Sequence, residues 1–411
     1  MPSLRPGRVW RHGSSTGADP GCPRHGGHLS RKPGPPVTDA SERDRCPRRT
    51  GTGPDFPAAP AHRWRRDPSP KLLAIPTIPP IDTPPGRARS RRPPAQAGSP
   101  ACRISVCMPT RNRGATVTAA LESLRRLEHD SFEVVVVDQS TDDLTRLAFT
   151  EIVGDDPRFA LIPSATVGKS AACNVGLAAA RGAIVAFTDD DCEAPTDWLS
   201  GIEQAFASHP TVAMICGGVR AIAHDPSVGA IPAFLPRRAR LLRSPWLAFR
   251  AQGIGANLAF RAAELRQAGA FDEVLGAGAM LRAGEDGDIA YRFLRAGHGI
   301  LELPDPAVLH SGLRTWGREL RDLAWDSAYS EGATYMKHLR LGDPVILPTF
   351  VIRGAFGMVA WRNLLLLRRP TGLGRLAAFA RGARTSFRFP IDAGSRRYRG
   401  PGRDPVRDAP G

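Results

Sequence analysis

The feature that most constrains the fold of this chain is a short apolar run, Ala183–Phe187, which leads through Thr188 into three consecutive carboxylates, Asp189, Asp190 and Asp191. Apolar runs of this length behind a glycine are typical of strands buried inside a parallel sheet. Open α/β sheets bind ligands beyond the carboxyl ends of such strands. Because three adjacent acids repel one another and resist desolvation, we expect a neutralising partner, and a hard cation such as Mg²⁺ or Mn²⁺ suits oxygen ligands. A solvated acidic turn is the simpler alternative.

The segments before this strand alternate between strand and helix patterns. Apolar runs that end in polar loops predict three earlier strands, over Ile104–Thr110, Phe132–Asp138 and Phe159–Pro163. Apolar residues spaced three or four apart between the first two runs predict a helix. A β-α-β-α succession of this kind indicates a doubly wound, mostly parallel α/β sheet, whose polar loops gather at one edge. That edge is the predicted ligand site.

A helical extension is predicted to follow the sheet. Aromatic and leucine residues at helical spacing predict one helix over residues 316–340. The segment 345–367 is strongly apolar, but Pro348, Arg353 and Arg362 interrupt it, so no stretch reaches the ~18 uncharged residues of a spanning helix. Two alternatives remain open for this segment: it lies in a membrane interface with its arginines on anionic headgroups, or it packs as a helical lid.

Composition separates the two ends of the chain from its middle. Residues 1–100 hold 21 of the 39 prolines and 18 of the 56 Lys and Arg, with few large apolar side chains. Such a segment cannot bury enough surface to offset its ordering entropy, so we predict disorder there and in residues 396–411. Residues 101–315 are predicted to form the α/β domain, and residues 316–395 the helical region. Since no aromatic residues alternate with the charges, a specific nucleic-acid partner is not expected, and a lipid- or nucleic-acid-binding arm is the less favoured alternative.

The cysteines and the start of the chain bear on the compartment. Seven cysteines without a CxxC pair suggest neither a disulfide framework nor a zinc site, and a reducing cytoplasm fits best. No apolar run follows Met1, so a secretory signal is not expected. The strong preference for Arg over Lys suggests a GC-rich bacterial genome. We therefore expect a bacterial, cytoplasmic protein, with peripheral contact to the inner face of the cell membrane left open.

Several short motifs in residues 104–310 together resemble the family 2 glycosyltransferases. Each motif is weak alone, but their order and spacing are specific. They are Pro109–Arg113, Val137-Asp138, Gly168–Gly176, Gly182–Asp191, Gly255–Asn257, Gly269–Asp272 and Gly284–Asp288. The resemblance implies the GT-A fold, a Rossmann-like α/β sheet, and the helical extension lies largely outside it. It also implies an enzyme that moves a sugar from a nucleoside-diphosphate donor to an acceptor glycan, lipid or small molecule, with inversion at the anomeric carbon.

The resemblance places the donor nucleotide against a set of polar residues. Arg113 and Lys169 are the candidates to meet phosphate, although either could be a solvated side chain. Asp138 could instead cap the next helix, and Asn174 could instead brace the backbone. Gln139 stands where many relatives carry a second acid, so the base stays open among those of uridine, guanosine and thymidine. The implied donor-binding residues are Pro109, Thr110, Asn112, Arg113, Asp138, Lys169, Asn174, Asp189 and Asp190.

The implied metal site uses the acidic stretch. Asp189 and Asp191 match the DxD signature of the family, and the resemblance implies that they hold Mg²⁺ or Mn²⁺. Asp190 would point elsewhere if the backbone there is extended, because side chains alternate along a strand. His310 ends a predicted strand at the right stage to be a third metal ligand, although a lone histidine is more often structural.

Asp286 matches the acid of the family's Glu-Asp motif, and the resemblance implies that it is the catalytic base. A positioned carboxylate that takes the proton of an attacking hydroxyl typically contributes ~10²–10⁴-fold. We favour Asp286 over Asp288 for this role. The expected function is a metal-dependent inverting glycosyltransferase in cell-envelope polysaccharide, glycolipid or related glycoconjugate synthesis. A catalytically inactive nucleotide-sugar-binding protein of the same fold is the alternative.

Overall fold

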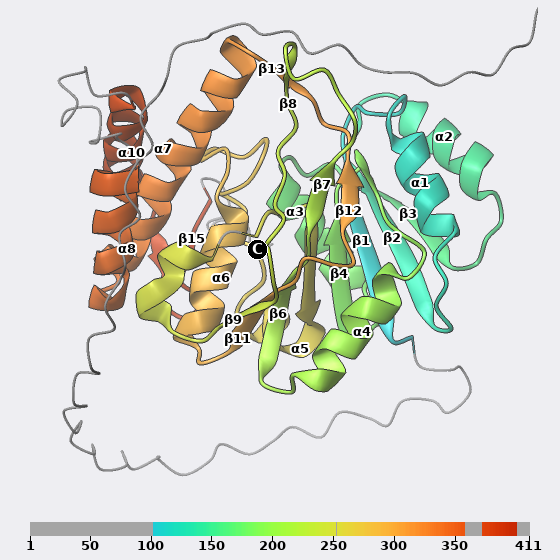
Figure 1. The fold of residues 1–411 in the computed structure, drawn as a ribbon, viewed down its shortest axis with the longest axis horizontal. Coiled ribbons are helices and arrows are strands. Elements are labelled where there is room, and N and C mark those ends of the chain that lie inside the picture. The colour runs from blue at the N-terminus through green and yellow to red at the C-terminus, as the bar shows by residue number, and fades with distance from the viewer. Residues whose placement is uncertain (1–101, 252, 358–371, 401–411) are drawn as a thin grey trace, which may run out of the picture. The chain divides into compact units, whose positions relative to one another are not determined.

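Figure 1 shows the computed structural model of the chain, which describes residues 102–251, 253–357 and 372–400. The disorder predicted for residues 1–100 and part of the segment 345–367 therefore lie outside the described residues. Within the described ranges, the central feature is an eight-stranded sheet with the strand order β3-β2-β1-β4-β10-β6-β11-β9. Its strands are β1 (Ile104–Thr110), β2 (Phe132–Asp138), β3 (Phe159–Pro163), β4 (Ile184–Thr188), β6 (Val212–Cys216), β9 (Arg240–Leu242), β10 (Asn257–Arg261) and β11 (Gly299–Glu302).

The doubly wound, mostly parallel sheet predicted from the sequence is confirmed. β1 pairs in parallel with β2 and β4, and β2 pairs in parallel with β3, so their carboxyl ends meet at one edge. The first three strands have the predicted bounds, and in β2 the run Val134–Val137 is buried on both faces of the sheet. β10 runs antiparallel between β4 and β6 and joins the two halves of the sheet.

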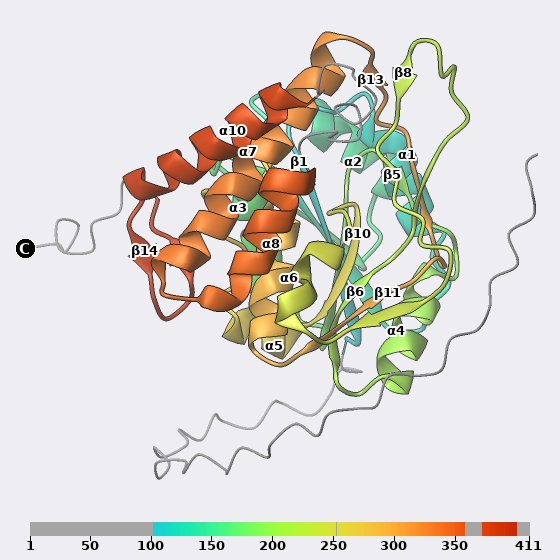
Figure 2. The same cartoon turned by 60° about the vertical axis from the view of Figure 1, so that its left-hand side comes forward.

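Helices cover both faces of the sheet, as Figure 1 and Figure 2 show. One apolar core forms between the sheet and α1, α2 and α4, where Leu121 and Trp198 are fully buried. A second core on the opposite face joins α3, α5 and α6 through Leu177, Leu265 and Phe293. These helices are α1 (Val117–Arg125), α2 (Leu144–Val153), α3 (Lys169–Ala179), α4 (Trp198–Ser208), α5 (Ala262–Gln267) and α6 (Glu285–Arg295).

Small sheets beside the main one carry residues of the predicted site. β12 pairs with β5 and β7, and its register puts His310 opposite Cys192, directly after the three acids. β13 pairs with β8 in a second small sheet. These elements are β5 (Cys192–Glu193), β7 (Val219–Ala221), β8 (Gly229–Ala230), β12 (Val308–His310) and β13 (Arg314–Thr315), with the 3-10 helix η1 (Pro245–Arg250).

The C-terminal region is helical, as the sequence predicts. α7 and α10 pack side by side (Figure 2) around a third core that contains Phe379 and Tyr398. No helix in the described ranges is long and apolar enough to cross a membrane. The elements are α7 (Arg318–Arg340), η2 (Pro344–Ile346), α8 (Leu347–Val351), the π-helical turn η3 (Ile352–Gly357), α10 (Leu373–Thr385), η4 (Ser386–Arg388), β14 (Ile391–Asp392) and β15 (Arg397–Tyr398).

The start predicted for the C-terminal tail is wrong. We expected disorder from residue 396, but β15 pairs with β14, and the ring of Tyr398 is buried. The hydroxyl of Tyr398 donates to the carbonyl of Ala333 over 2.7 Å and lies 2.6 Å from Ser386 Oγ. Burial of one large aromatic side chain holds a short arginine-rich segment in place, and composition alone does not reveal this contribution. Residues 401–411 lie outside the described part of the chain.

Candidate active site

Predicted site residues from four separate segments meet in a cavity of about 400 Å³ at the carboxyl edge of β1 and β4. The loops after these two strands, the start of α3 and the end of β12 contribute to its wall, and we call it the β1–β4 cavity. The predicted residues that line it are Pro109, Thr110, Arg113, Lys169, Asp189, Asp190, Asp191 and His310. Four other predicted residues, all described, do not line it, namely Asn112, Asp138, Asn174 and Asp286.

Asp190 ties the loop after β4 to the loop after β1. The carboxylate belongs to a residue that is only 6% exposed, and it accepts hydrogen bonds from Thr110 Oγ1 (2.7 Å) and Arg113 Nη1 (3.1 Å). Burial raises the pKa of Asp190 to about 6, although Arg113 opposes this shift. Asp190 would point elsewhere only if the backbone stayed extended, and it does not. The backbone turns after β4 ends at Thr188, so all three carboxylates reach the same cavity.

Asp191 and His310 form the part of the cavity that suits a divalent cation. His310 Nδ1 lies 2.8 Å from the carbonyl of Pro232, which only accepts, so Nδ1 carries a hydrogen and Nε2 is directed toward Asp191. Burial opposes the charge of the ring, but Asp191 and the Pro232 carbonyl outweigh it and raise the pKa of His310, so Nε2 carries either a proton toward Asp191 or, in its place, a cation. Nε2 lies 3.3 Å from Asp191 Oδ1, and Arg113 Nη1 lies 2.5 Å from Asp191 Oδ2. His310 and Arg113 outweigh burial and hold the pKa of Asp191 well below its usual range. Cys192 adjoins them, but burial raises the pKa of its thiol, so it is a poor ligand for a hard cation.

Asp189 has a different partner from Asp190 and Asp191. Its carboxylate forms an ion pair with Lys169, the first residue of α3. Burial disfavours the charge of Lys169, but Asp189 and Glu285 outweigh it and raise the pKa of Lys169. The structure therefore brings together two of the three predicted metal ligands, Asp191 and His310, and pairs Asp189 with a cation instead.

Three predicted donor-binding residues hold the backbone instead of facing the cavity. Asn112, in a left-handed conformation with φ 54°, accepts a hydrogen bond on Oδ1 from the N–H of Thr141 (2.9 Å). Asp138 Oδ1 accepts from the backbone N–H of Ser140 over 2.9 Å, within the loop. It does not cap the next helix, because α2 begins only at Leu144. Asn174 both donates to and accepts from the backbone of Phe271, each over 3.0 Å, which matches the bracing alternative. These contacts fix the loops that bear the three residues.

Asp286 lines a second cavity of about 530 Å³, which lies between the start of α6 and the face of α7. We call it the α6–α7 cavity. Asp286 Oδ1 accepts from the N–H of Gly287 over 2.7 Å, and burial raises the pKa of the carboxyl group. Burial also raises the pKa of Glu285 to about 7. Ile254 lines both cavities, so they adjoin. A molecule in one is therefore next to a molecule in the other.

Comparison with models of protein families finds a match to the part of the chain that contains the three acids. The model of the family described as glycosyl transferase family 2 matches residues 105–252, which contain β1 to β4 and the three acids. Residues 105–252 thus match a glycosyl transferase family 2 domain. The fold and the enzyme class expected from the motifs of this domain are thus those of a transferase family.

Curated relatives of the domain carry matching names. The pre-mycofactocin glycosyltransferase of Mycobacterium tuberculosis is 28% identical over 283 residues, which cover 67% of this chain and 54% of the relative. The putative glycosyltransferase EpsH of Bacillus subtilis is 31% identical over 96 residues, or 23% of this chain and 26% of the relative. The chain thus spans about half the length of the mycobacterial relative.

Solved glycosyltransferases are also similar in structure. S. aureus TarS 1–349 in complex with UDP-GlcNAc is 18% identical, with a TM-score of 0.49 over 68% of this chain and 81% of that chain. The mannosyltransferase PcManGT from Pyrobaculum calidifontis, in complex with GDP-Man and Mn²⁺, is 20% identical, with a TM-score of 0.45 over 69% and 87%.

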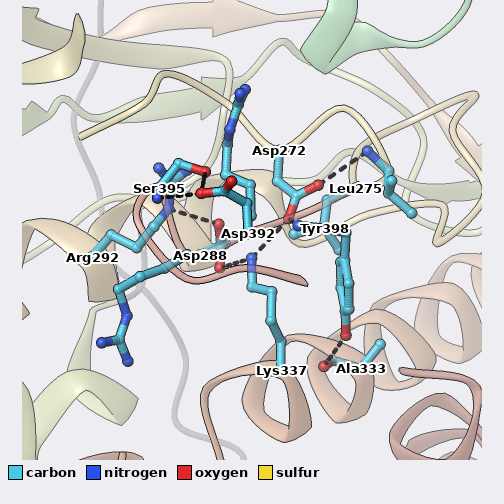
Figure 3. Close-up of polar contacts among 12 residues, drawn as sticks. Asp272, Leu275, Asp288, Arg292, Ala333, Lys337, Asp392, Ser395 and Tyr398 are labelled. Carbon is cyan, nitrogen blue, oxygen red and sulfur yellow. Dashed lines mark hydrogen bonds and ion pairs between the residues drawn. The ribbon is translucent and has the colours of Figure 1, made fainter. Parts of the chain in front are cut away.

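A fully buried ionic network joins α6 and α7 (Figure 3). Lys337 Nζ lies 2.8 Å from Asp272 Oδ2 and 2.6 Å from Asp288 Oδ1, and all three side chains are completely buried. Arg292 Nε (2.9 Å) and His338 Nε2 (3.0 Å) also reach Asp288. Together these groups outweigh burial and hold the pKa of Asp288 well below its usual range. Asp288 is held in these buried ion pairs and lines neither cavity.

Several residues of the two cavities were not singled out from the sequence. Pro232, which orients His310, comes from a stretch without a recognisable pattern, and Arg314 lies beyond the last motif. Cys192 lines neither cavity but lies beside Asp191 and His310, and its place directly after the acids could have indicated it. Ser330 and Thr334 line the α6–α7 cavity from α7, where their helical spacing carries no signal of a site.

Proposed function

We propose that this chain is a metal-dependent, inverting glycosyltransferase that moves a sugar from a nucleoside-diphosphate donor to an acceptor hydroxyl. The observation that carries the proposal is the meeting of Asp191 and His310 in one cavity, with His310 locked by the carbonyl of Pro232 so that Nε2 faces the carboxylate. These two residues are 119 positions apart in the sequence, so their meeting is a product of the fold.

The β1–β4 cavity has the charges that a metal-bound diphosphate requires. Asp191 and the Nε2 atom of His310 would hold Mg²⁺ or Mn²⁺, because a carboxylate and an imidazole nitrogen suit such ions once the cation displaces the proton of Nε2. The ion, when bound, supplies Lewis-acid stabilisation of the departing diphosphate. Arg113 and Lys169 add two cations on the same wall and would contact phosphate oxygens.

The α6–α7 cavity supplies the base. In the proposed transfer, the carboxylate of Asp286 takes the proton of the acceptor hydroxyl, and the oxygen forms a bond to the anomeric carbon. The bond from that carbon to the diphosphate oxygen breaks, and its electron pair leaves with the nucleoside diphosphate. Attack from the face opposite the leaving group inverts the configuration. The raised pKa of Asp286 supports this role, because it makes the carboxylate a stronger base than an exposed one.

A thermal-shift measurement on the full chain tests the proposal. UDP-, GDP- and dTDP-sugars should be compared with and without Mn²⁺, since a ligand that binds only the folded state raises its melting temperature. We expect one nucleotide class to raise Tm in a metal-dependent way, and Asp191→Ala to lose that shift. Asp322→Ala, which removes an exposed carboxylate on α7, should keep it. No shift with any nucleotide in folded wild-type protein would contradict the proposal.

We also propose a cell-envelope acceptor reached by peripheral membrane contact. Leu347, Val351 and Ile352 are all more than a third exposed on α8 and the turn after it, and they precede residues 358–367. Co-sedimentation with phosphatidylglycerol vesicles measures this contact. We expect binding by wild type and weaker binding by Leu347→Ser/Val351→Ser, and equal recovery of both proteins in the supernatant would contradict it.

A further inference from the structure

Two elements that are far apart in the sequence, η1 and α8, contact each other and form an exposed apolar surface. Scattered apolar side chains on a protein surface are ordinary, but a group of large ones on touching elements indicates an interaction site. All members of the group are more than a third exposed. They are Trp246, Leu247, Leu347, Val351 and Ile352. Together with the two arginines that flank η1, Arg243 and Arg250, we call them the η1–α8 surface.

Both elements turn apolar side chains outward although other parts of them could be buried. No residue of η1 is buried, even though the turn contains Trp246, Leu247 and Phe249. α8 is attached to the protein through Thr349, which is 1% exposed. Leu347 and Val351 are four residues apart and therefore share another face of α8, which is exposed. Apolar side chains that stay in water forgo the free energy of burial, so a partner that covers them would bind favourably.

The charge beside this surface has one sign. Residues 237–250 contain five arginines and no acid, and residues 344–357 contain one arginine and no acid. Arg240 pairs with Glu302, whereas Arg243 and Arg250 are exposed and form no ion pair with a described residue. A cationic rim without compensating carboxylates attracts an anionic partner.

The combination of side chains narrows the anionic partner to a lipid bilayer. Tryptophan is favoured at the headgroup level of a membrane, leucine beyond it, and arginine on lipid phosphates. A nucleic-acid backbone would neutralise Arg243 and Arg250 but would leave Leu347 and Val351 in water. An anionic bilayer satisfies the arginines and covers the aliphatic side chains at the same time.

The η1–α8 surface borders the cavity of the proposed base. Phe249 at the end of η1 and Arg353 in η3 both line the α6–α7 cavity, which Asp286 also lines. A bilayer that covers the η1–α8 surface would therefore lie beside this cavity.

We propose that the η1–α8 surface docks on an anionic lipid bilayer, with Trp246 and Leu247 among the headgroups and Arg243 and Arg250 on lipid phosphates. The inference deepens the membrane contact of the proposed function and rests on it. It adds η1 as a second anchoring element, and it requires negatively charged lipid.

The lipid requirement is tested by co-sedimentation of the full chain with vesicles of phosphatidylglycerol or of phosphatidylcholine. We expect partition to be roughly tenfold or more stronger on phosphatidylglycerol, since each arginine near an anionic surface contributes about a fivefold factor. Raising NaCl from ~0.1 M to ~1 M shortens the screening length from about 10 Å to about 3 Å and should weaken this binding. Equal partition onto the two kinds of vesicle would overturn the inference.

The role of η1 is tested with Trp246→Ser. Trp246 is 51% exposed, so Tm should not change, whereas partition onto phosphatidylglycerol should fall about tenfold. Trp316→Ser is the matched control, because Trp316 is 57% exposed and lies outside the η1–α8 surface, between β13 and α7. It should bind vesicles as wild type does. Wild-type binding by Trp246→Ser, or an equal loss in both variants, contradicts the inference.

The arginines are tested with the double variant Arg243→Gln/Arg250→Gln. Its partition onto phosphatidylglycerol should fall about fivefold per arginine. The control Arg318→Gln/Arg321→Gln removes the same charge from exposed positions on α7 and should bind nearly as wild type. If both double variants bind like wild type, other basic residues, such as those in residues 1–100, provide the attraction. If both lose binding equally, only net charge matters. Either result refutes the assignment to this surface.

A second copy of the chain is the other occupant to test. In sedimentation velocity without vesicles, wild type and Trp246→Ser should have the same sedimentation coefficient. A larger coefficient for wild type would assign the surface to self-association and overturn the inference. Absence of wild type from the pellet with both vesicles would refute the inference together with the membrane contact on which it rests. The nucleotide-dependent Tm shift is measured without lipid, so its failure separately identifies a failure of the proposed sugar transfer.

Discussion

At the scale of single residues, environment gives neighbouring carboxylates different properties. Asp190 and Asp191 are adjacent and both buried, yet burial raises the pKa of Asp190 to about 6, and the pKa of Asp191 lies well below its usual range. Asp190 accepts hydrogen bonds from Thr110 Oγ1 and Arg113 Nη1, whereas Asp191 accepts from the same Arg113 nitrogen and lies beside His310. At neutral pH both acids therefore carry charge, and the more strongly ionised one is the one beside His310.

The residue-scale prediction concerns Asp286. Asp286→Asn keeps the size of the side chain and removes the base, so kcat should fall ~10²–10⁴-fold. The donor-induced Tm shift should remain, because Asp286 does not line the β1–β4 cavity. Steady-state nucleotide release and thermal shift measure the two effects.

Asp322→Asn is the control for this substitution, since it removes an exposed carboxylate on α7 by the same chemical change. It should leave kcat unchanged. If Asp286→Asn retains more than a tenth of the wild-type kcat, another group is the base.

At the scale of elements, α7 contributes both to the α6–α7 cavity and to the buried ionic network. One face presents Ser330 and Thr334 to the α6–α7 cavity, and another carries Lys337 and His338 into the ionic network with α6. Because Asp288 in that network belongs to the first turn of α6, the same contacts hold the helix start that bears the proposed base. The helical extension thus contributes residues to the wall of the α6–α7 cavity.

The element-scale prediction concerns Lys337. Lys337→Met leaves the carboxylates of Asp272 and Asp288 without their shared cation, and a broken buried pair typically costs about 3–5 kcal/mol of unfolding free energy. Urea unfolding followed by circular dichroism measures the loss.

Arg318→Met is the matched control on the same helix. Arg318 pairs with Asp322 at the surface, and its side chain is 90% exposed, so the variant should unfold at the wild-type urea concentration. Equal stability of Lys337→Met and wild type would show that the network contributes no net stability.

At the scale of the whole molecule, the described part is held by three cores, and polar contacts join them. Two cores pack on the faces of the sheet, and the third lies under α7, α10 and the C-terminal hairpin. Lys337, Asp272 and the backbone N–H of Tyr398 connect the third core to the sheet domain (Figure 3). Stability of the whole should therefore respond to the protonation of this junction.

The whole-molecule prediction is a loss of stability in mild acid. Burial lowers the pKa of His338 to about 4, although Asp288 opposes this. Between pH 6.5 and 4 the unfolded chain binds a proton that folded His338 excludes, so stability falls as pH falls, by at most about 3 kcal/mol. Above pH 6.5 this contribution is complete.

Urea midpoints at pH 4.5, 5.5, 6.5 and 7.5 measure the slope. His338→Gln cannot titrate and can still donate to Asp288, so its stability should fall less steeply over the same range. Parallel slopes for the two proteins would assign the acid sensitivity to other groups.

The local pattern of the sequence determined the parallel half of the sheet. The bounds of β1, β2 and β3 follow from apolar runs and their polar ends, because strand formation there depends on burial of adjacent residues. The same pattern located the three acids and the basic residues Arg113 and Lys169 at the sheet edge. Roles that depended on side-chain direction, such as those of Asn112 and Asn174, were beyond it, since short polar side chains bond to whichever backbone group lies nearby.

Only the tertiary structure decided which distant residues meet. The register of β12 against β5 brings His310 to Asp191, and the packing of α7 on α6 forms the cavity that Asp286 lines. Such meetings depend on long-range pairing and on helix packing, which leave no local periodicity to read. The sequence thus determined the sheet and its charged edge, whereas the fold decided the pairing of Asp191 with His310, the second cavity and the ordered end of the chain at Tyr398, because each arises from contacts between segments far apart.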